Sequence, residues 1–232
     1  MKDRAQVIFM SGFKSDMEGT KALFLDQWAA ANGRGFLRFD YSGHGQSSGD
    51  FLEGTIGDWF ADSLEIIDQC TEGPLVVVGS SMGGWIALLA ALARPERITG
   101  LLGIAAAPDF TEDLMWNRFS EDTRKTITTE GVYAYPSDYD DEEPYQITLK
   151  LIEEGRQNLL LDKPIPLTIP IRLIHGMKDE DVPLSTALIL TEQLTSEDVT
   201  LTLLKEGDHR LSNPEQLALV RRELELLCDQ VE

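Results

Sequence analysis

The stretch PLVVVGSSMGGWIALLAAL, residues 74–92, decides the fold of this chain. An apolar run at 75–78, with valine at its last three positions, is followed by a glycine, two serines and, after one methionine, two more glycines. An uninterrupted apolar run then continues to residue 92. The first run is typical of a buried strand, and the second is typical of a buried helix. The stretch therefore predicts a strand, a tight turn and a helix, with the serines at the turn.

The two serines differ in the residues that flank them. Ser81 lies between Gly79 and Gly83, so it occupies the centre of a Gly-x-Ser-x-Gly motif, whereas Ser80 has a valine and a methionine at the same offsets. In a nucleophile elbow this central serine is exposed on a sharp strand-to-helix turn. The glycines are needed because a Cβ there would clash with the neighbouring strand and helix. Ser81 is the predicted nucleophile, and the alternative is that it only caps the helix.

Apolar strand-like runs alternate with helical patterns along most of the chain. The strand candidates are residues 6–10, 35–41, 75–80, 98–106, 169–176 and 199–207. The helix candidates lie near 19–32, 55–70, 83–93, 184–195 and 213–230. Such alternation predicts an α/β fold with a mostly or wholly parallel sheet of about six strands and helices on both faces.

One interval, residues 109–166, breaks this alternation and is too long for a plain connection. We expect it to form a small cap of short helices within a single domain that spans residues 1–232. Its apolar residues are Leu114, Met115, Trp116, Phe119, Val132, Tyr133 and Tyr135. Among them, Trp116 and Tyr133 are the predicted substrate-binding residues, and the acidic run 137–143 is predicted to form a solvent-facing rim.

A serine nucleophile needs a base, and the chain has three histidines. In hydrolases of this kind the base follows the nucleophile and the acid in the sequence. His44 precedes Ser81, and His175 ends a predicted strand, where we expect it to be buried and to position the next loop. His209 follows the last predicted strand. His209 is therefore the predicted base.

The acid of such a site is expected at the carboxyl end of a strand, between the nucleophile and the base. The segment HGMKDEDVP, residues 175–183, places Asp179 there, with Glu180 and Asp181 as neighbouring rivals. Open parallel sheets carry their sites at these strand ends. We expect Asp179 to hold the tautomer of His209 and to stabilise its imidazolium form.

An oxyanion hole requires two backbone N–H groups. One comes from the residue after the nucleophile, which is Met82. The other comes from the loop after the first strand, where Gly12 allows close approach and Phe13 is the predicted donor.

Composition excludes several classes of partner. The formal net charge of −20 repels nucleic acid and anionic lipid. No apolar run reaches membrane-spanning length, and the first residues do not form a signal or transit peptide. We expect Cys70 and Cys228 to be free, buried thiols, which favours a cytoplasmic location. Cysteine and histidine show no metal-ligand spacing, and the predicted chemistry needs no metal or other cofactor.

The motifs GFKSDMEGTKA (12–22), FLRFDYSGHGQSSG (36–49), VGSSMGGWIALLAALARPE (78–96), IPIRLIHGMKDEDVP (169–183) and GDHR (207–210) together resemble the α/β-hydrolase superfamily. More narrowly, they resemble its subgroup that contains the mitochondrial palmitoyl-protein thioesterase, also described as an acyl-glucuronide esterase. The resemblance implies a triad of Ser81, Asp179 and His209, the residues selected above. It also implies acyl ester or thioester substrates, small molecules or acylated proteins. The superfamily's first two antiparallel strands have no counterpart, which leaves six parallel strands.

These observations favour a serine hydrolase that cleaves carboxylic esters or thioesters through an acyl-enzyme. The alternative from another class is a small-molecule binding or sensing protein on the same fold with slow or no turnover. Burst kinetics with an activated ester separates the two. A peptidase is less favoured because the cap is small, and no oligomeric state is predicted.

Overall fold

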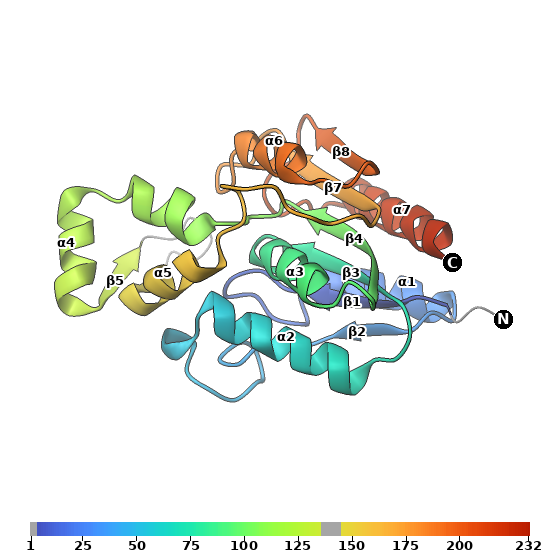
Figure 1. Cartoon of the computed structure of the whole chain (residues 1–232), viewed down its shortest axis with the longest axis horizontal. Coiled ribbons are helices and arrows are strands. Elements are labelled where there is room, and N and C mark those ends of the chain that lie inside the picture. Colours follow the sequence, from blue (N-terminus) through green and yellow to red (C-terminus); the bar gives the residue numbers. More distant parts are fainter. Residues whose placement is uncertain (1–3, 136–144) are drawn as a thin grey trace.

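The computed structural model describes residues 4–135 and 145–232, and its centre is a six-stranded parallel sheet (Figure 1). The strands are β1 (Gln6–Met10), β2 (Phe36–Arg38), β3 (Leu75–Ser80), β4 (Ile98–Ile104), β7 (Ile171–Gly176) and β8 (Val199–Leu204). Their order across the sheet is β2-β1-β3-β4-β7-β8, and every neighbouring pair is parallel. The predicted sheet of about six parallel strands is therefore confirmed.

The sheet is buried on both faces, which explains why its strands are continuous apolar runs. Along β1, Val7 and Phe9 pack into one apolar cluster, and Ile8 and Met10 pack into another on the opposite face. Successive strand residues point to opposite faces, so a strand between two helix layers needs apolar side chains at every position.

Five longer helices cover the sheet. They are α1 (Thr20–Ala31), α2 (Ile56–Cys70), α3 (Met82–Ala93), α6 (Leu184–Gln193) and α7 (Pro214–Val231). The apolar clusters place α1 and α7 on one face and α2, α3 and α6 on the other. Local capping sets two of their starts: Thr55 accepts the amide N–H of Asp58, and Asn213 forms a capping box with Gln216. None of the helices in the described ranges is long and apolar enough to cross a membrane.

The cap lies beyond the carboxyl ends of the strands, at the left of Figure 1. It contains the π-helical turn η2 (Thr111–Met115), the short 3₁₀ helices η3 (Trp116–Arg118) and η4 (Arg156–Asn158), the helices α4 (Glu121–Glu130) and α5 (Leu149–Gly155), and the strands β5 (Val132–Tyr135) and β6 (Tyr145–Thr148). A further 3₁₀ turn, η1 (Phe51–Glu53), follows β2.

The prediction that the cap is made of short helices alone is wrong, because β5 and β6 pair as an antiparallel ribbon. Each strand has four residues, too few for an alternating pattern to stand out from a helical one. A separate small cluster, with Ile127, Ile147 and Ile152 at its centre, holds these elements together. The acidic run 137–143 lies outside the described residues.

Two other sequence expectations need correction. Several strands end earlier than predicted; β4 stops at Ile104 because Ala105 adopts φ of 45°, which breaks the extended backbone. Both cysteines are free, but only Cys228 is buried, since Cys70 lies on the exposed last turn of α2.

Candidate active site

Ser81 lies at the sharp turn between β3 and α3, with φ of 55° and ψ of −120°. A Cβ on Gly79 would lie 2.2 Å from the carbonyl oxygen of Gly83, and one on Gly83 would lie 2.0 Å from that of Met10. Neither position therefore accepts a side chain. The N–H of Ser81 donates to the Ile104 carbonyl at 2.9 Å, which fixes the turn against β4.

Three predicted residues from separate parts of the chain form one hydrogen-bonded series. His209 Nε2 lies 3.0 Å from Ser81 Oγ, and His209 Nδ1 lies 2.8 Å from Asp179 Oδ2. The Asp179 side chain is fully buried, and its Oδ1 accepts the N–H groups of Asp181 at 3.1 Å and Val182 at 2.8 Å. Because an ionised carboxylate only accepts, Nδ1 carries the proton and Nε2 is free to accept the serine hydroxyl.

The other two histidines hold loops instead. His175 is buried, and its Nε2 donates to the Val182 carbonyl at 3.0 Å, which supports the loop that carries Asp179. Burial lowers the pKa of His175, so its ring is neutral at pH 7. His44 accepts the backbone N–H of Lys14 at 3.3 Å through Nε2. The position expected for His175 is thus the one observed.

The two predicted oxyanion donors belong to segments that adjoin Ser81. Met82 is the first residue of α3, where a backbone N–H has no acceptor within the helix. Gly12 approaches closely enough that a Cβ on it would lie 3.3 Å from Ser81 Cβ, and Phe13 follows it. Both Phe13 and Met82 line the cavity above the serine. Their role as donors stays a prediction.

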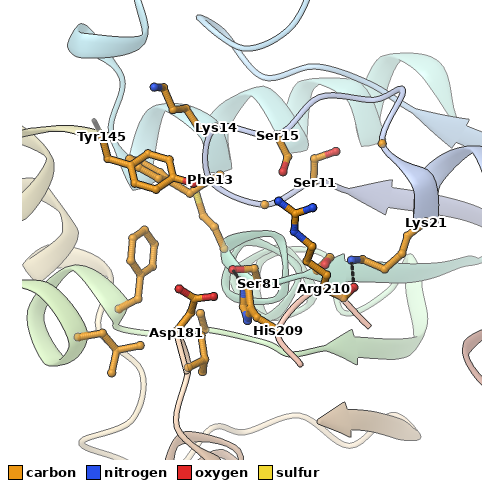
Figure 2. Close-up of a pocket in the computed structure, with 18 of the residues that line it drawn as sticks. Ser11, Phe13, Lys14, Ser15, Lys21, Ser81, Tyr145, Asp181, His209 and Arg210 are labelled. Atoms are coloured by element: carbon orange, nitrogen blue, oxygen red, sulfur yellow. Dashed lines mark hydrogen bonds between the residues drawn. The ribbon is translucent and has the colours of Figure 1, made fainter. Parts of the chain in front are cut away.

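A cavity of about 600 Å³ opens above Ser81 and His209 (Figure 2). Residues of the cap and the β1 loop supply most of its apolar lining: Phe13, Phe110, Leu114, Met115 and Tyr145. Figure 2 shows Phe13 and Tyr145 on one side of Ser81, the apolar end, where the charged side chains of Lys14 and Asp181 also lie. Its polar end is lined by Ser11, Ser15, Lys21 and Arg210, which Figure 2 shows on the other side of Ser81. This volume suits a small organic substrate.

The structure does not bring Trp116 and Tyr133 to this cavity; neither is among its lining residues. The Trp116 ring instead lies under two guanidinium groups, 4.9 Å from that of Arg156 and 5.5 Å from that of Arg124. Tyr133 packs against Phe119, with ring centroids 6.2 Å apart. These aromatic residues stabilise the cap itself, and Leu114 and Met115 from the same predicted set face the cavity.

The sequence did not predict two residues: Lys21, which lines the polar end, and Asp40, which holds the loop that leads to it. Lys21 lines the cavity, and its Nζ donates to the Arg210 carbonyl, next to His209, at 2.5 Å. Burial lowers the pKa of Lys21 to about 8. Asp40 accepts the N–H of Met17 at 2.6 Å and that of Gln46 at 2.9 Å, so it links two loops. An aspartate in a Gly- and Ser-rich loop is the sequence signal for such a role.

A third missed residue, Asp109, stands where the cap begins. Its carboxylate is buried and accepts the N–H groups of Leu160 at 2.9 Å and Leu161 at 2.8 Å. It therefore ties the beginning of the cap to its end. Burial raises the pKa of Asp109 to about 6.

One group of possible metal ligands coincides with the hydrogen-bonded series. Asp179, Asp181 and His209 offer ligand atoms within 4.8 Å of one another. Both ring nitrogens of His209 already face hydrogen-bond partners, so a metal ion there would have to displace Ser81 or Asp179. The donor set fits the hydrogen-bonded series better than a metal site.

Known proteins resemble this chain over nearly its whole length. The mitochondrial palmitoyl-protein thioesterase ABHD10 of Bos taurus is 40% identical over 225 residues, which cover 97% of this chain and 73% of the relative. The mouse α/β-hydrolase domain-containing protein 10 has a similar structure, with a TM-score of 0.92 and 39% identity over 100% of this chain and 92% of that one. A crystal structure from Agrobacterium vitis S4 gives a TM-score of 0.94 and 40% identity, covering 99% of this chain and 88% of that one.

These relatives contradict the predicted cytoplasmic location. The thioesterases of Bos taurus and Homo sapiens that match this chain are both named as mitochondrial. The prediction depended on the first residues and on free cysteines, and free cysteines do not distinguish one reducing compartment from another. The cytoplasmic prediction is therefore wrong.

A protein family described as serine aminopeptidase S33 matches residues 1–133, which include β1 to β4 and the elbow at Ser81. The match agrees with the parallel sheet, the elbow and the relatives given above. The chain therefore belongs to this family within the α/β-hydrolase superfamily, and it is a hydrolase.

Proposed function

We propose that the protein is a serine hydrolase that cleaves carboxylic esters or thioesters, with Ser81 as nucleophile, His209 as base and Asp179 as the residue that orients the base. The observation that carries this proposal is the hydrogen-bonded series at the elbow, with 3.0 Å from Ser81 to His209 and 2.8 Å from His209 to Asp179. A nucleophile, a base and an orienting acid within hydrogen-bonding reach are the arrangement that activates a serine.

In the first half of the reaction, Ser81 Oγ attacks the acyl carbonyl carbon while its proton passes to His209 Nε2. The N–H groups of Met82 and Phe13 donate hydrogen bonds to the negatively charged carbonyl oxygen; in other serine hydrolases the loss of one such donor costs roughly 10²–10³ in kcat. Asp179 stabilises the imidazolium. The C–O or C–S bond to the leaving group then breaks, His209 returns the proton to the departing alkoxide or thiolate, and the acyl group remains esterified to Ser81.

In the second half, His209 takes a proton from water, and the resulting hydroxide attacks the acyl-enzyme. The tetrahedral intermediate uses the same two backbone donors. It collapses with release of the carboxylic acid, and the proton on His209 returns to Ser81. No cofactor takes part in either half.

The two ends of the cavity suggest where each part of the substrate lies. The acyl group occupies the apolar end beside Phe110, Leu114 and Met115, where each buried CH₂ contributes roughly 0.8 kcal/mol. The leaving group lies at the polar end beside Lys21. The palmitoyl-protein thioesterase relatives support an acyl thioester, either a small molecule or an acylated protein, as the substrate.

A chain-length series tests this proposal. We expect kcat/KM for p-nitrophenyl esters and acyl thiols to rise over several carbons and then to plateau as the apolar end fills. An initial burst of p-nitrophenol, equal to the enzyme concentration, is expected when deacylation is slower than acylation. A flat series overturns the fatty-acyl preference, and absence of turnover with every member overturns the hydrolase mechanism in favour of a binding protein.

A further inference from the structure

We propose that His44 is a positioning residue that holds the turn Gly12–Ser15, and with it the Phe13 N–H, in the orientation needed to stabilise the oxyanion. This inference rests on the proposed function, because it presumes that Phe13 donates to the carbonyl oxygen of the substrate. His44 acts through the backbone and does not touch the reacting atoms.

The turn after β1 adopts a conformation that its residues do not favour by themselves. The Ser15 N–H donates to the Gly12 carbonyl at 3.1 Å, and Lys14 has φ of 58°, whereas Phe13 does not have positive φ. A positive φ at the third residue of a turn but not at the second is typical of a type II turn, which favours glycine at the third position. A lysine there persists only where surrounding contacts hold it.

His44 supplies such a contact. Its Nε2 accepts the Lys14 N–H at 3.3 Å, and its Nδ1 faces the Ser42 carbonyl at 3.4 Å. Nδ1 therefore carries the proton, and Nε2 offers its lone pair to the turn. If the peptide between Phe13 and Lys14 flipped, the Lys14 N–H would leave His44 and the turn would relax to negative φ.

The ring of His44 has little freedom to follow such a movement. His44 is only 3% exposed and meets the rings of Trp59 at 4.9 Å and Phe51 at 5.1 Å edge-on. The ring of Phe13 packs against the same two side chains, at 5.9 Å and 5.0 Å. One aromatic cluster thus fixes both His44 and the residue whose N–H it orients. Burial also lowers the pKa of His44, so the ring stays neutral and Nε2 remains an acceptor at pH 7.

The loop has a second anchor, which lies beyond the turn and does not bond to its central peptide. Asp40 accepts the N–H of Met17 at 2.6 Å, beyond the turn. On the other side, Gly12 is in contact distance of Ser81, so a shift of the turn moves it directly against or away from the nucleophile. Between these two points, His44 is the side chain hydrogen-bonded to the turn's central peptide among the described residues.

Two substitutions at position 44 separate positioning from packing. His44→Phe keeps an aromatic ring among Phe51 and Trp59 and removes the acceptor, whereas His44→Gln places an amide oxygen near the position of Nε2. We expect His44→Phe to lower kcat for p-nitrophenyl butyrate by about 10- to 100-fold with KM within about threefold of wild type, a smaller loss than removal of a whole donor. His44→Gln is expected to recover most of kcat.

A tetrahedral inhibitor provides the readout that a packing role would not move. Ser81 Oγ adds to the carbonyl carbon of an alkyl trifluoromethyl ketone, its proton passes to His209, and the former carbonyl oxygen becomes an oxyanion in the hole. The matched secondary alcohol has no carbonyl group and binds without forming one. His44→Phe is expected to raise the inhibition constant of the trifluoromethyl ketone by the same factor by which it lowers kcat. The inhibition constant of the alcohol is expected to stay unchanged. Equal weakening of both ligands, with a kcat that His44→Gln does not restore, overturns the proposal.

Position 13 connects the effect to its N–H. Proline suits the second residue of a type II turn, so Phe13→Pro keeps the turn and removes the backbone N–H donor. Phe13→Ala removes the same aromatic ring but keeps the N–H donor. We expect His44→Phe to lower kcat in the Phe13→Ala background and to have no further effect in the Phe13→Pro background. Equal effects of His44→Phe in both backgrounds overturn the positioning role. Equal kcat for Phe13→Pro and Phe13→Ala instead overturns Phe13 as the donor, and activity of Ser81→Ala overturns the proposed function.

Discussion

The elbow below the cavity and the cap above it are determined by different constraints. At the elbow, a Cβ on Gly79 or Gly83 would meet a backbone carbonyl oxygen at 2.2 Å or 2.0 Å, so few sequences are compatible with the turn. In the cap, several aromatic residues compete for a few interior positions, and Trp116 and Tyr133 pack within the cap while Leu114 faces the cavity. A turn that excludes side chains can therefore be predicted from the sequence. Which of several apolar cap residues will face the cavity cannot be predicted from it.

The largest expected effect is on kcat and tests the residues that activate the serine of the elbow. His209→Ala and Asp179→Asn are each expected to lower kcat at least a thousandfold, because the triad members act as a unit. Asp181→Asn keeps the backbone N–H that donates to Asp179 and is expected to cost less than about tenfold. Turnover of purified, folded variants on p-nitrophenyl butyrate is the measurement. An Asp181→Asn variant worse than Asp179→Asn would reassign the acid.

The next prediction tests whether the elbow is sterically determined. Gly83→Ala is expected to lower the free energy of unfolding by about 3 kcal/mol or more, because its Cβ meets the Met10 carbonyl and neither backbone yields easily. Gly19→Ala is the matched control, since its Cβ would lie 3.4 Å from its nearest neighbour and its φ is −57°. Urea unfolding measures both, and a Gly83→Ala variant as stable as Gly19→Ala contradicts the steric account.

The sequence predicted the elbow side of the site well for a physical reason. The motif around Ser81 follows from a turn that excludes side chains, and the parallel strands follow from burial on both faces, so both leave patterns within a few residues. The positions of Asp179 and His209 near Ser81 could be predicted because the carboxyl ends of parallel strands meet at one edge of the sheet.

The rest of the site could not be predicted, because it depends on contacts between distant residues. The Nε2 of His44 meets a backbone N–H 30 positions earlier, and Asp109 meets amides 51 and 52 positions later. Such partners have no spacing rule. Likewise, β5 and β6 are too short to show the two-residue alternation of a strand. Leu114 and Trp116 are both apolar residues of the same segment, yet of these two only Leu114 lines the cavity.

A smaller effect concerns the charge at the base of the cap. Burial raises the pKa of Asp109 from its ordinary value of 3.8 to about 6 in the folded protein, so the native state retains a proton that the unfolded state loses between these values. The free energy of unfolding is therefore expected to fall as pH rises from about 4 to 6, by about 2 kcal/mol more than in Asp109→Asn. Unfolding curves of both proteins across this range provide the measurement, and parallel profiles contradict the shift.

The smallest expected effect is on kcat/KM and distinguishes cap residues that line the cavity from those that do not. Leu114→Ala is expected to lower kcat/KM roughly tenfold for the longest acyl chains and little for acetyl, because it removes apolar lining from the cavity. Trp116→Ala is the control, since it loosens the cap without lining the cavity, and its chain-length dependence is expected to match wild type. The reverse pattern would restore Trp116 as the residue that contacts substrate.

The most direct test of the account is the site of covalent labelling by a fluorophosphonate. We expect a single adduct on Ser81 by peptide mass spectrometry, no adduct in folded Ser81→Ala, and normal labelling in Ser80→Ala. The two serines are adjacent, yet only Ser81 lies at the exposed point of the elbow, 3.0 Å from His209. Labelling that persists in folded Ser81→Ala, or that disappears in folded Ser80→Ala, would contradict the assignment of the nucleophile.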